Sequence, residues 1–472
     1  MKNINIKLIG LIFLMALALG SCKDWIDTNI NKNPDLPADV PMSSILTGVQ
    51  ANMAYNTIGG NDIARVTAIW MQYFQGIARQ SQSTSNYYWL ESDDNNLWVT
   101  DYTNTMMNLQ TLITKANTAG NSTYRGIAEV LLANSIGVVT DVWGDIPYSE
   151  AFQGVANLNP NFDAQQQIYT TILNLLNDAI VQLGMAGAPT ITGDVMYGGD
   201  PSLWLQAANS LKARYILHKS KIDANAWADA LSALNGAINS NATDLEFTFF
   251  DAAGAQNPLY QFMQQRGDIS MAQVFVDTLN LVRHDPRLPM FATVSLDTAR
   301  PYFGNGWGES SNDASLPGTA VASASAVVPF ITYVETLFIE AECLYKTNAP
   351  VEQVRAALIA AVTASMQKWG ADYTAWMAIY TQYINYSSGA PLFKEIMTQK
   401  WIALYNQAES FVDWRRTDNV IGLQANPTSS AQRNEIPRHY PEAQSEANYN
   451  PNTPKNIDLW SRVWWDATTP GK

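Results

Sequence analysis

Apolar residues recur every three or four positions through long parts of the chain, which is the spacing of an amphipathic α-helix. The clearest example follows Asp163 and Gln166, whose spacing is that of a capping box. Asp200, followed by Pro201, predicts the start of another helix. A further helix is predicted around residues 227–238. The same spacing predicts helices in 41–53, 63–78, 98–116, 124–139, 330–346, 351–369 and 392–407.

The order of these helices predicts how the chain is organised. Successive helix pairs, with small residues where neighbours would cross, indicate a mostly α fold of stacked αα-hairpins of tetratricopeptide type, although the repeat consensus is not cleanly present. We expect one domain over 41–472, with a helical scaffold at about 41–240 and 330–415. The helical period fades in an irregular insertion at about 241–329 and in an irregular tail at about 416–472. Short strands are predicted at 245–250 and 291–294.

The N-terminus has the pattern of an export signal. Lys2 and Lys7 precede an apolar run at 8–19, which is shorter than the roughly 20 residues that a spanning helix needs. The run ends in Leu-Gly-Ser before Cys22, as in a bacterial lipobox. We therefore expect a signal peptide at 1–21, an acylated Cys22 as lipid anchor, and an extended tether over 22–40 that is rich in Asn, Asp and Pro. An ordinary signal peptide followed by a stray cysteine is the alternative.

Composition narrows the classes of protein further. The chain has 472 residues, of which 47% are apolar, and its net charge of −14 argues against a nucleic-acid partner. Besides Cys22 the sequence holds only Cys343, which lies among apolar residues at helical spacing and is expected to be a buried, inert thiol. The three histidines show no metal-ligand spacing, so we expect neither a metal centre nor a cofactor, although acidic loops leave a calcium ion possible.

Several motifs then occur in a fixed order along nearly the whole chain. They are the lipobox at Cys22, DVWGDIPYSEA at 141–151, Trp204 with ANSLKAR at 208–214, DPRLP at 285–289, TYVETLFIEAE at 332–342, and IPRHYP at 436–441 leading into QSE at 444–446. In this combination the chain resembles the SusD/RagB family of outer-membrane lipoproteins, in its SusD-like branch.

The resemblance implies a receptor of Bacteroidetes rather than an enzyme. Such a protein is held in the outer membrane by its acyl chains, is exposed on the cell surface, and captures oligosaccharides or peptides. It hands them to a SusC-like TonB-dependent transporter. The helix pairs would face the transporter, and the ligand would lie among the irregular segments on the opposite side. Within the shared motifs, Asn209, Arg214, Glu335 and Glu342 are best interpreted as buried polar ties of the scaffold.

Ligand contacts have to be inferred from chemistry. Sugar rings stack on aromatic faces, and their hydroxyl groups need polar partners. Aromatic residues outside the helical pattern are therefore candidates, with polar residues nearby. The candidates form two aromatic clusters and three polar partners: Tyr87, Tyr88 and Trp89; Tyr302, Phe303 and Trp307; and Arg79, Asn305 and Asp268. The alternative is that either cluster fills a second small core beneath the loops.

Acidic residues suggest a rival function. Asp141, Asp145 and Glu150 follow a predicted helix, where we expect them to cap helices and fix the loop. A helical-barrel glycoside hydrolase would need two carboxylates, for which Asp141 with Asp145, or Asp93 with Asp94, are formal candidates. Three tryptophans near the C-terminus are assigned to packing of the tail rather than to ligand stacking: Trp460, Trp464 and Trp465.

Overall fold

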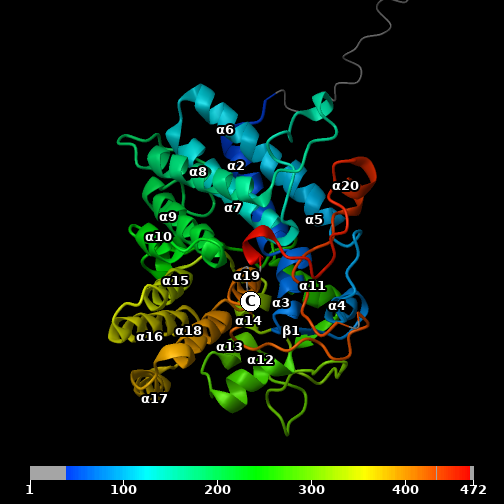
Figure 1. The fold of residues 1–472 in the computed structure, drawn as a ribbon, viewed down its shortest axis with the longest axis vertical. Coiled ribbons are helices and arrows are strands. Elements are labelled where there is room, and N and C mark those ends of the chain that lie inside the picture. The colour runs from blue at the N-terminus through cyan, green and yellow to red at the C-terminus, as the bar shows by residue number, and fades with distance from the viewer. Residues whose placement is uncertain (1–38, 432, 468–472) are drawn as a thin grey trace, which may run out of the picture. The chain divides into compact units, whose positions relative to one another are not determined.

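The computed structural model describes residues 39–431 and 433–467 (Figure 1). The chain divides into a short N-terminal unit, Met1–Pro41, and a second unit that begins at Met42. The predicted signal peptide, Cys22 and nearly all of the predicted tether lie outside the described residues. Every helix and strand named below belongs to the second unit.

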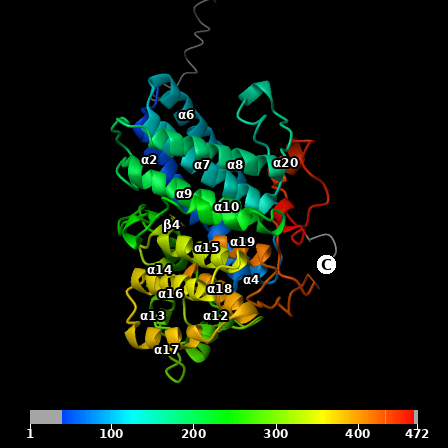
Figure 2. The ribbon, with the colours of Figure 1, turned by 60° about the vertical axis from the view of Figure 1, so that its left-hand side comes forward.

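Long helices pack side by side along most of this unit, as the helical spacing predicts (Figure 2). Each contacts the next in the order α2, α6, α7, α8, α9, α10, α15, α16 and α17, and α18 packs against α15. The prediction of a mostly helical fold of stacked helix pairs is thus confirmed. The helices are α2 (Met42–Asn52), α6 (Met107–Ala119), α7 (Ser122–Trp143), α8 (Gln165–Leu183), α9 (Pro201–His218), α10 (Ala226–Ala233), α15 (Tyr333–Lys346), α16 (Val351–Lys368), α17 (Thr374–Asn385) and α18 (Gly389–Ala403).

Shorter helical elements connect or flank this stack. The short α-helices are α3 (Val66–Trp70), α4 (Arg79–Ser85), α5 (Asn95–Thr100), α11 (Pro258–Gln265), α12 (Gln273–Asp277), α13 (Leu288–Phe291), α14 (Thr319–Ala322), α19 (Glu409–Arg416) and α20 (Gln444–Tyr449). Four π-helical segments are η1 (Met53–Ile58), η2 (Asn61–Arg65), η3 (Asp101–Met106) and η7 (Thr278–Val282), and four 3₁₀ turns are η4 (Gly154–Ala156), η5 (Lys219–Lys221), η6 (Asn241–Thr243) and η8 (Trp464–Asp466). The sequence pattern did not predict α17 or α19 as helices.

One of the two predicted helix starts is confirmed and the other is wrong. Asp200 accepts a hydrogen bond from the Ser202 amide at 2.8 Å and caps α9. Asp163 does not cap α8, because its carboxylate accepts hydrogen bonds from the backbone amides of Tyr148 and Ser149. Asp145 takes over the expected position and accepts from the Gln165 amide at 2.8 Å. Asp145 therefore caps α8, and Asp163, which the spacing predicts as the cap, instead fixes the loop at 148–149.

The predicted helix 63–78 is also wrong in its second half. The helix ends at Trp70, and the chain turns at Gln72, whose φ of 61° is left-handed. The following residues form strand β1 (Phe74–Gly76), which pairs antiparallel with β3 (Ile269–Met271). All three residues of β1 are buried, so the segment is continuously apolar. Hydrophobic periodicity cannot distinguish a short, fully buried strand from a buried helical segment.

A second small sheet pairs β2 (Leu245–Phe247) antiparallel with β4 (Val328–Ile331). The strand predicted at 245–250 is therefore present but shorter. The strand predicted at 291–294 is wrong, since Phe291 ends α13 and Ala292 forms only an isolated bridge with Pro317. Both sheets join segments that are far apart in the sequence.

Buried polar pairs tie the scaffold together, as expected of the shared motifs. Arg214 on α9 donates two hydrogen bonds to Glu335 on α15, both at 2.6 Å, and neither side chain is appreciably exposed. Glu342 on α15 pairs with the buried Arg416 on α19. Cys343 is buried, as predicted from the apolar residues around it. Helix α7 is long and apolar enough to cross a membrane, but 94% of its most apolar window is buried inside the folded unit.

Candidate ligand-binding site

Strands β1 and β3 bring the two predicted aromatic clusters into one region. Directly after β1, helix α4 folds back over the strand, and this requires glycine at position 76. A Cβ there would lie 1.8 Å from the Ser81 carbonyl oxygen, so only glycine permits the approach. The cluster at residues 87–89 follows α4. The cluster at 302–307 adjoins the other edge of β3, because Asn305 forms a parallel bridge with Ala272.

Arg79 lies at the start of α4 and is held by a buried carboxylate. Its Nε donates to Asp268 Oδ2 at 3.1 Å, and its Nη2 also contacts this carboxylate. The side chain of Asp268 is 2% exposed and that of Arg79 is 57% exposed. Arg79 has a φ of 46°, which is uncommon for a residue with a side chain and costs energy. The fold therefore presents this guanidinium to solvent in a fixed orientation.

Asn305 is structural rather than exposed. Its amide donates to Ser270 Oγ and to the Ser311 carbonyl, both at 2.9 Å, and accepts from the Ser311 amide. The side chain is almost completely buried. With its hydrogen-bonding capacity in use, Asn305 shapes the loop that carries Trp307.

A segment of the C-terminal tail, 424–429, lies between the two clusters. The Asn426 amide donates to the Tyr87 hydroxyl at 2.8 Å, and the Asn426 side chain donates to the Ser85 carbonyl at 2.7 Å. On its other side the segment approaches Gly308, just after the second cluster: a Cβ placed on Gly308 would lie 3.5 Å from Thr428 Oγ1. Thr428 is exposed and was not among the sequence candidates, since no local signal connects it to residues more than a hundred positions away.

Exposure separates the candidates into two groups. Tyr87 is 3% exposed and Trp89 7%, so both pack in the core, which is the alternative that the sequence left open. Tyr88 is 56% exposed. Trp307 and Tyr302 are partly buried, and Tyr302 packs against the main core. Phe303 is also partly buried, beneath the Arg300 guanidinium, which lies 3.8 Å from its ring centroid. The side chains available to a ligand on this face are thus Tyr88, Trp307, Arg79 and Thr428. We call this set the aromatic face.

The carboxylates of the rival hydrolase hypothesis are occupied by structural roles. Asp141 accepts hydrogen bonds from the Tyr169 hydroxyl and from the Trp465 indole at 3.1 Å. Asp145 caps α8, and Glu150 accepts from the Asn161 amide and side chain. These contacts confirm the capping and loop-fixing interpretation for Asp145 and Glu150. For Asp141 the interpretation is wrong, because this residue lies within α7 and joins that helix to α8 and to the C-terminal tail. Trp465 is fully buried, which confirms its assignment to packing.

The second carboxylate pair does not form a site either. Asp94 is completely buried, and Asp93 accepts a hydrogen bond from the Leu90 amide at 2.9 Å. Burial raises the pKa of Asp94 to about 9. A carboxyl group without exposed surface cannot reach a glycosidic bond. Within 39–431 and 433–467, no three His, Cys, Asp or Glu side chains form a group that could hold a metal ion.

Comparison with known proteins identifies the fold. A sequence profile for SusD-like proteins, described as "Starch-binding associating with outer membrane", matches residues 34–441. The chain belongs to the SusD-like family. That description points to an association with the outer membrane, and members of the family are binding proteins rather than enzymes. No curated protein gives a significant match.

Solved structures of SusD-like proteins share the fold at low sequence identity. A SusD/RagB family protein from Bacteroides thetaiotaomicron is 23% identical, with a TM-score of 0.79, and the match covers 91% of this chain and 100% of that one. A chitin-binding SusD homolog from Flavobacterium johnsoniae is 20% identical, with a TM-score of 0.79 and coverage of 91% and 99%. A SusD homolog from Bacteroides uniformis is 21% identical, with a TM-score of 0.79 and coverage of 91% and 100%.

Proposed function

We propose that this SusD-like protein is a cell-surface, nutrient-binding lipoprotein. It captures an oligosaccharide, or alternatively a peptide, on the aromatic face and delivers it to a SusC-like TonB-dependent transporter. Family membership supports the nutrient-binding role, and the chitin-binding neighbour from Flavobacterium johnsoniae supports a glycan as ligand. Acylated Cys22 anchors the protein in the outer membrane.

The observation that carries the ligand proposal is that the segment 424–429 approaches both the stretch that carries the exposed Tyr88 and the loop that carries the partly buried Trp307. Tyr88 and Trp307 offer flat apolar surfaces on which the C–H face of a sugar can stack. Arg79, already oriented by Asp268, can donate to sugar hydroxyls. The Thr428 hydroxyl donates to Asn426 Oδ1 at 2.8 Å and can accept a hydrogen bond from a sugar hydroxyl. Because Asp268 neutralises Arg79, the face favours an uncharged, hydroxyl-rich ligand over an anionic one.

The first experiment is a titration of residues 23–472 with a panel of plant, algal and microbial oligosaccharides and of mixed peptides, followed by tryptophan fluorescence and calorimetry. Stacking on one aromatic side chain is worth about 0.5–1.5 kcal/mol beyond area burial. Replacing both Tyr88 and Trp307 with Ala should therefore weaken binding about tenfold, with little change in thermal stability. Tyr386, which directly follows α17 and is 83% exposed, supplies the control substitution Tyr386→Ala. Equal affinity of the double variant and the wild type would rule out the aromatic face.

The anchor is tested separately. A Cys22→Ala variant expressed in a host that processes lipoproteins should lose its acyl chains and leave the outer-membrane fraction. Cell fractionation and labelling with a radioactive fatty acid measure this outcome. Continued membrane attachment of the unlabelled variant would contradict the lipid anchor, while leaving the ligand proposal intact.

A further inference from the structure

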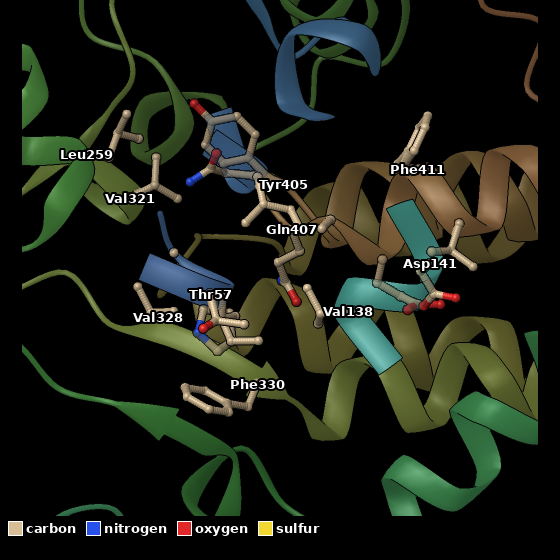
Figure 3. A pocket seen from close by; sticks show the side chains of 18 of the residues that line it. Thr57, Val138, Asp141, Leu259, Val321, Val328, Phe330, Tyr405, Gln407 and Phe411 are labelled. Atoms are coloured by element: carbon tan, nitrogen blue, oxygen red, sulfur yellow. The ribbon is translucent and has the colours of Figure 1, made fainter. Parts of the chain in front are cut away.

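A pocket of different character lies within the helical unit (Figure 3). It is bounded by η1, α7, α14, β4 and the turn between α18 and α19, and none of the side chains of the aromatic face lines it. The centres of water molecules can occupy about 70 Å³ of its interior. One water molecule needs roughly 10–15 Å³ by this measure, so the pocket has room for about five. Covalently bonded atoms lie closer together than neighbouring water molecules do. A space that holds about five water molecules can therefore hold one small substituted ring.

The accessibility of residues on α7 is consistent with this space. Every residue from Gly126 to Trp143 is buried except Val138, which is partly exposed in the middle of this core helix. Val138 lines the pocket, as Figure 3 shows. A gap in the packing of an otherwise closed helix is unusual in a protein interior, where side chains fill space as densely as in organic crystals.

One end of the pocket is apolar. Leu259, Val321, Val328 and Phe330 lie on its wall, contributed by α11, α14 and β4. All four are buried core residues. Small-molecule sites are concave and mainly apolar, with a few polar groups that fix orientation. This wall suits a hydrocarbon or aromatic group.

The charged residues near the other end are paired with one another. Arg214 is bound to Glu335 at 2.6 Å, and Glu409 lies 3.0 Å from His218 Nε2. His218 Nδ1 lies 3.4 Å from Asp141. Although burial alone would lower it, the neighbouring Glu409 and Asp141 raise the pKa of His218 to about 9, so the histidine is charged at neutral pH and balances these carboxylates. A charged ligand would have to be buried without a counter-charge of its own, which is costly.

Arg415, the remaining charged group of the lining, is only partly occupied. Its Nη1 donates to the carbonyl oxygens of Asp141 at 2.7 Å and Arg438 at 2.8 Å. Its guanidinium carbon lies 4.0 Å from the ring centroid of Phe411 and 4.6 Å from that of Trp465. Its Nε and Nη2 have no hydrogen-bond partner within the described residues and can donate to a ligand oxygen. Three cationic side chains, Arg214, His218 and Arg415, are nevertheless set against three carboxylates, Asp141, Glu335 and Glu409, so an anionic ligand would disturb the charge balance of this region.

Gln407 supplies a further polar side chain with free hydrogen-bonding capacity, next to Asn406, whose buried Oδ1 also has no partner within the described residues. It lies in the turn between α18 and α19, and Figure 3 shows its side chain reaching into the pocket near Thr57 and Val138. Within the described residues its amide group forms no hydrogen bond, whereas the Thr57 hydroxyl donates to Asp101. An amide can both donate and accept. We propose that this pocket binds an uncharged small molecule with an apolar ring or branched body and one hydrogen-bonding group, held by Gln407.

Two probes of similar shape test this proposal on the mature protein. p-Cresol and toluene differ by one hydroxyl group, and 4-methylbenzoate adds a negative charge to the same ring. Calorimetry and thermal shift should show p-cresol binding about fivefold more tightly than toluene, in line with one net hydrogen bond. 4-Methylbenzoate should not bind. Gln407→Leu should retain toluene and remove the preference for p-cresol.

Two filling variants, Val138→Phe and Val321→Phe, approach the pocket from opposite walls and should abolish binding of both neutral probes. Circular dichroism checks their fold, and one correctly folded variant of the two is sufficient for the test. Val155→Phe, at a loop position that is 94% exposed, and Trp307→Ala on the aromatic face are controls that should leave binding unchanged. Failure of both neutral probes to bind the wild type, equal binding to a folded filling variant, or preferential binding of 4-methylbenzoate would each overturn the proposal. A loss of binding in Trp307→Ala alone would place the probe on the aromatic face and refute it too.

Discussion

Asp94 is a carboxyl group that the fold keeps neutral. It stands at the N-terminal boundary of α5, yet its side chain does not cap that helix. It is completely buried, and within the described residues neither of its oxygens has a hydrogen-bond partner. Burial raises its pKa to about 9, and the nearby Glu442 carboxylate acts in the same direction. At neutral pH the folded protein therefore holds a proton that the unfolded chain releases.

The sign and size of the effect follow from proton linkage. Because the folded state binds the extra proton, the stability contributed by this group falls as pH rises from about 4 towards 9. Each unit of pKa difference corresponds to about 1.4 kcal/mol. From the ordinary value of 3.8 to pH 7 the accumulated cost is at most about 4 kcal/mol. Asparagine has nearly the same shape and does not titrate. The stability of Asp94→Asn relative to the wild type should therefore increase with pH, by up to about 1.4 kcal/mol per unit between pH 5 and 8.

Guanidinium unfolding at pH 5, 6, 7 and 8, followed by tryptophan fluorescence, measures this slope. The difference between the two proteins matters, not the absolute stability of either, because other groups titrate in both. Asp372→Asn, at an exposed position before α17, is the matched control and should give no pH-dependent difference. A stability difference for Asp94→Asn that is the same at pH 5 and pH 8 would refute the claim that the fold keeps this carboxyl group protonated.

Two further substitutions test the assignment of residues to the core. Trp89→Ala should lower the free energy of unfolding by about 3–5 kcal/mol, because the indole is buried. Thermal unfolding measures this change. A loss of ligand affinity at unchanged stability would instead place Trp89 in the binding site. Glu335→Gln should cost about 3–5 kcal/mol by leaving Arg214 buried without its counter-charge. Denaturant unfolding checks the second change, and a cost below 1 kcal/mol would show that water or another group compensates Arg214.

The aromatic face shows how far sequence reasoning reaches into a site. The absence of helical spacing drew attention to the segments around Tyr88 and Trp307, and the fold brings these segments to the two sides of one tail segment. It could not separate Tyr88 from its neighbours Tyr87 and Trp89. Three consecutive aromatic residues look alike in sequence, whereas the Tyr87 hydroxyl is bonded to Asn426 and Trp89 packs against Tyr440. Thr428 was missed for the same reason, since its proximity to the face depends on distant contacts.

The sequence by itself determined the features whose causes are local. Helix hydrogen bonds join residues four positions apart, so apolar spacing was sufficient to find α8 and α9, and Asp200 was sufficient to locate the start of α9. Only the tertiary structure decided features that depend on distant partners. Strand β1 forms because β3 lies beside it. Asp145 caps α8 in place of Asp163 because the loop at 145–149 folds against Asp163, whose carboxylate accepts from the Tyr148 amide. Burial and strand pairing are set by what other segments bring, and that information is not contained in any local stretch of the chain.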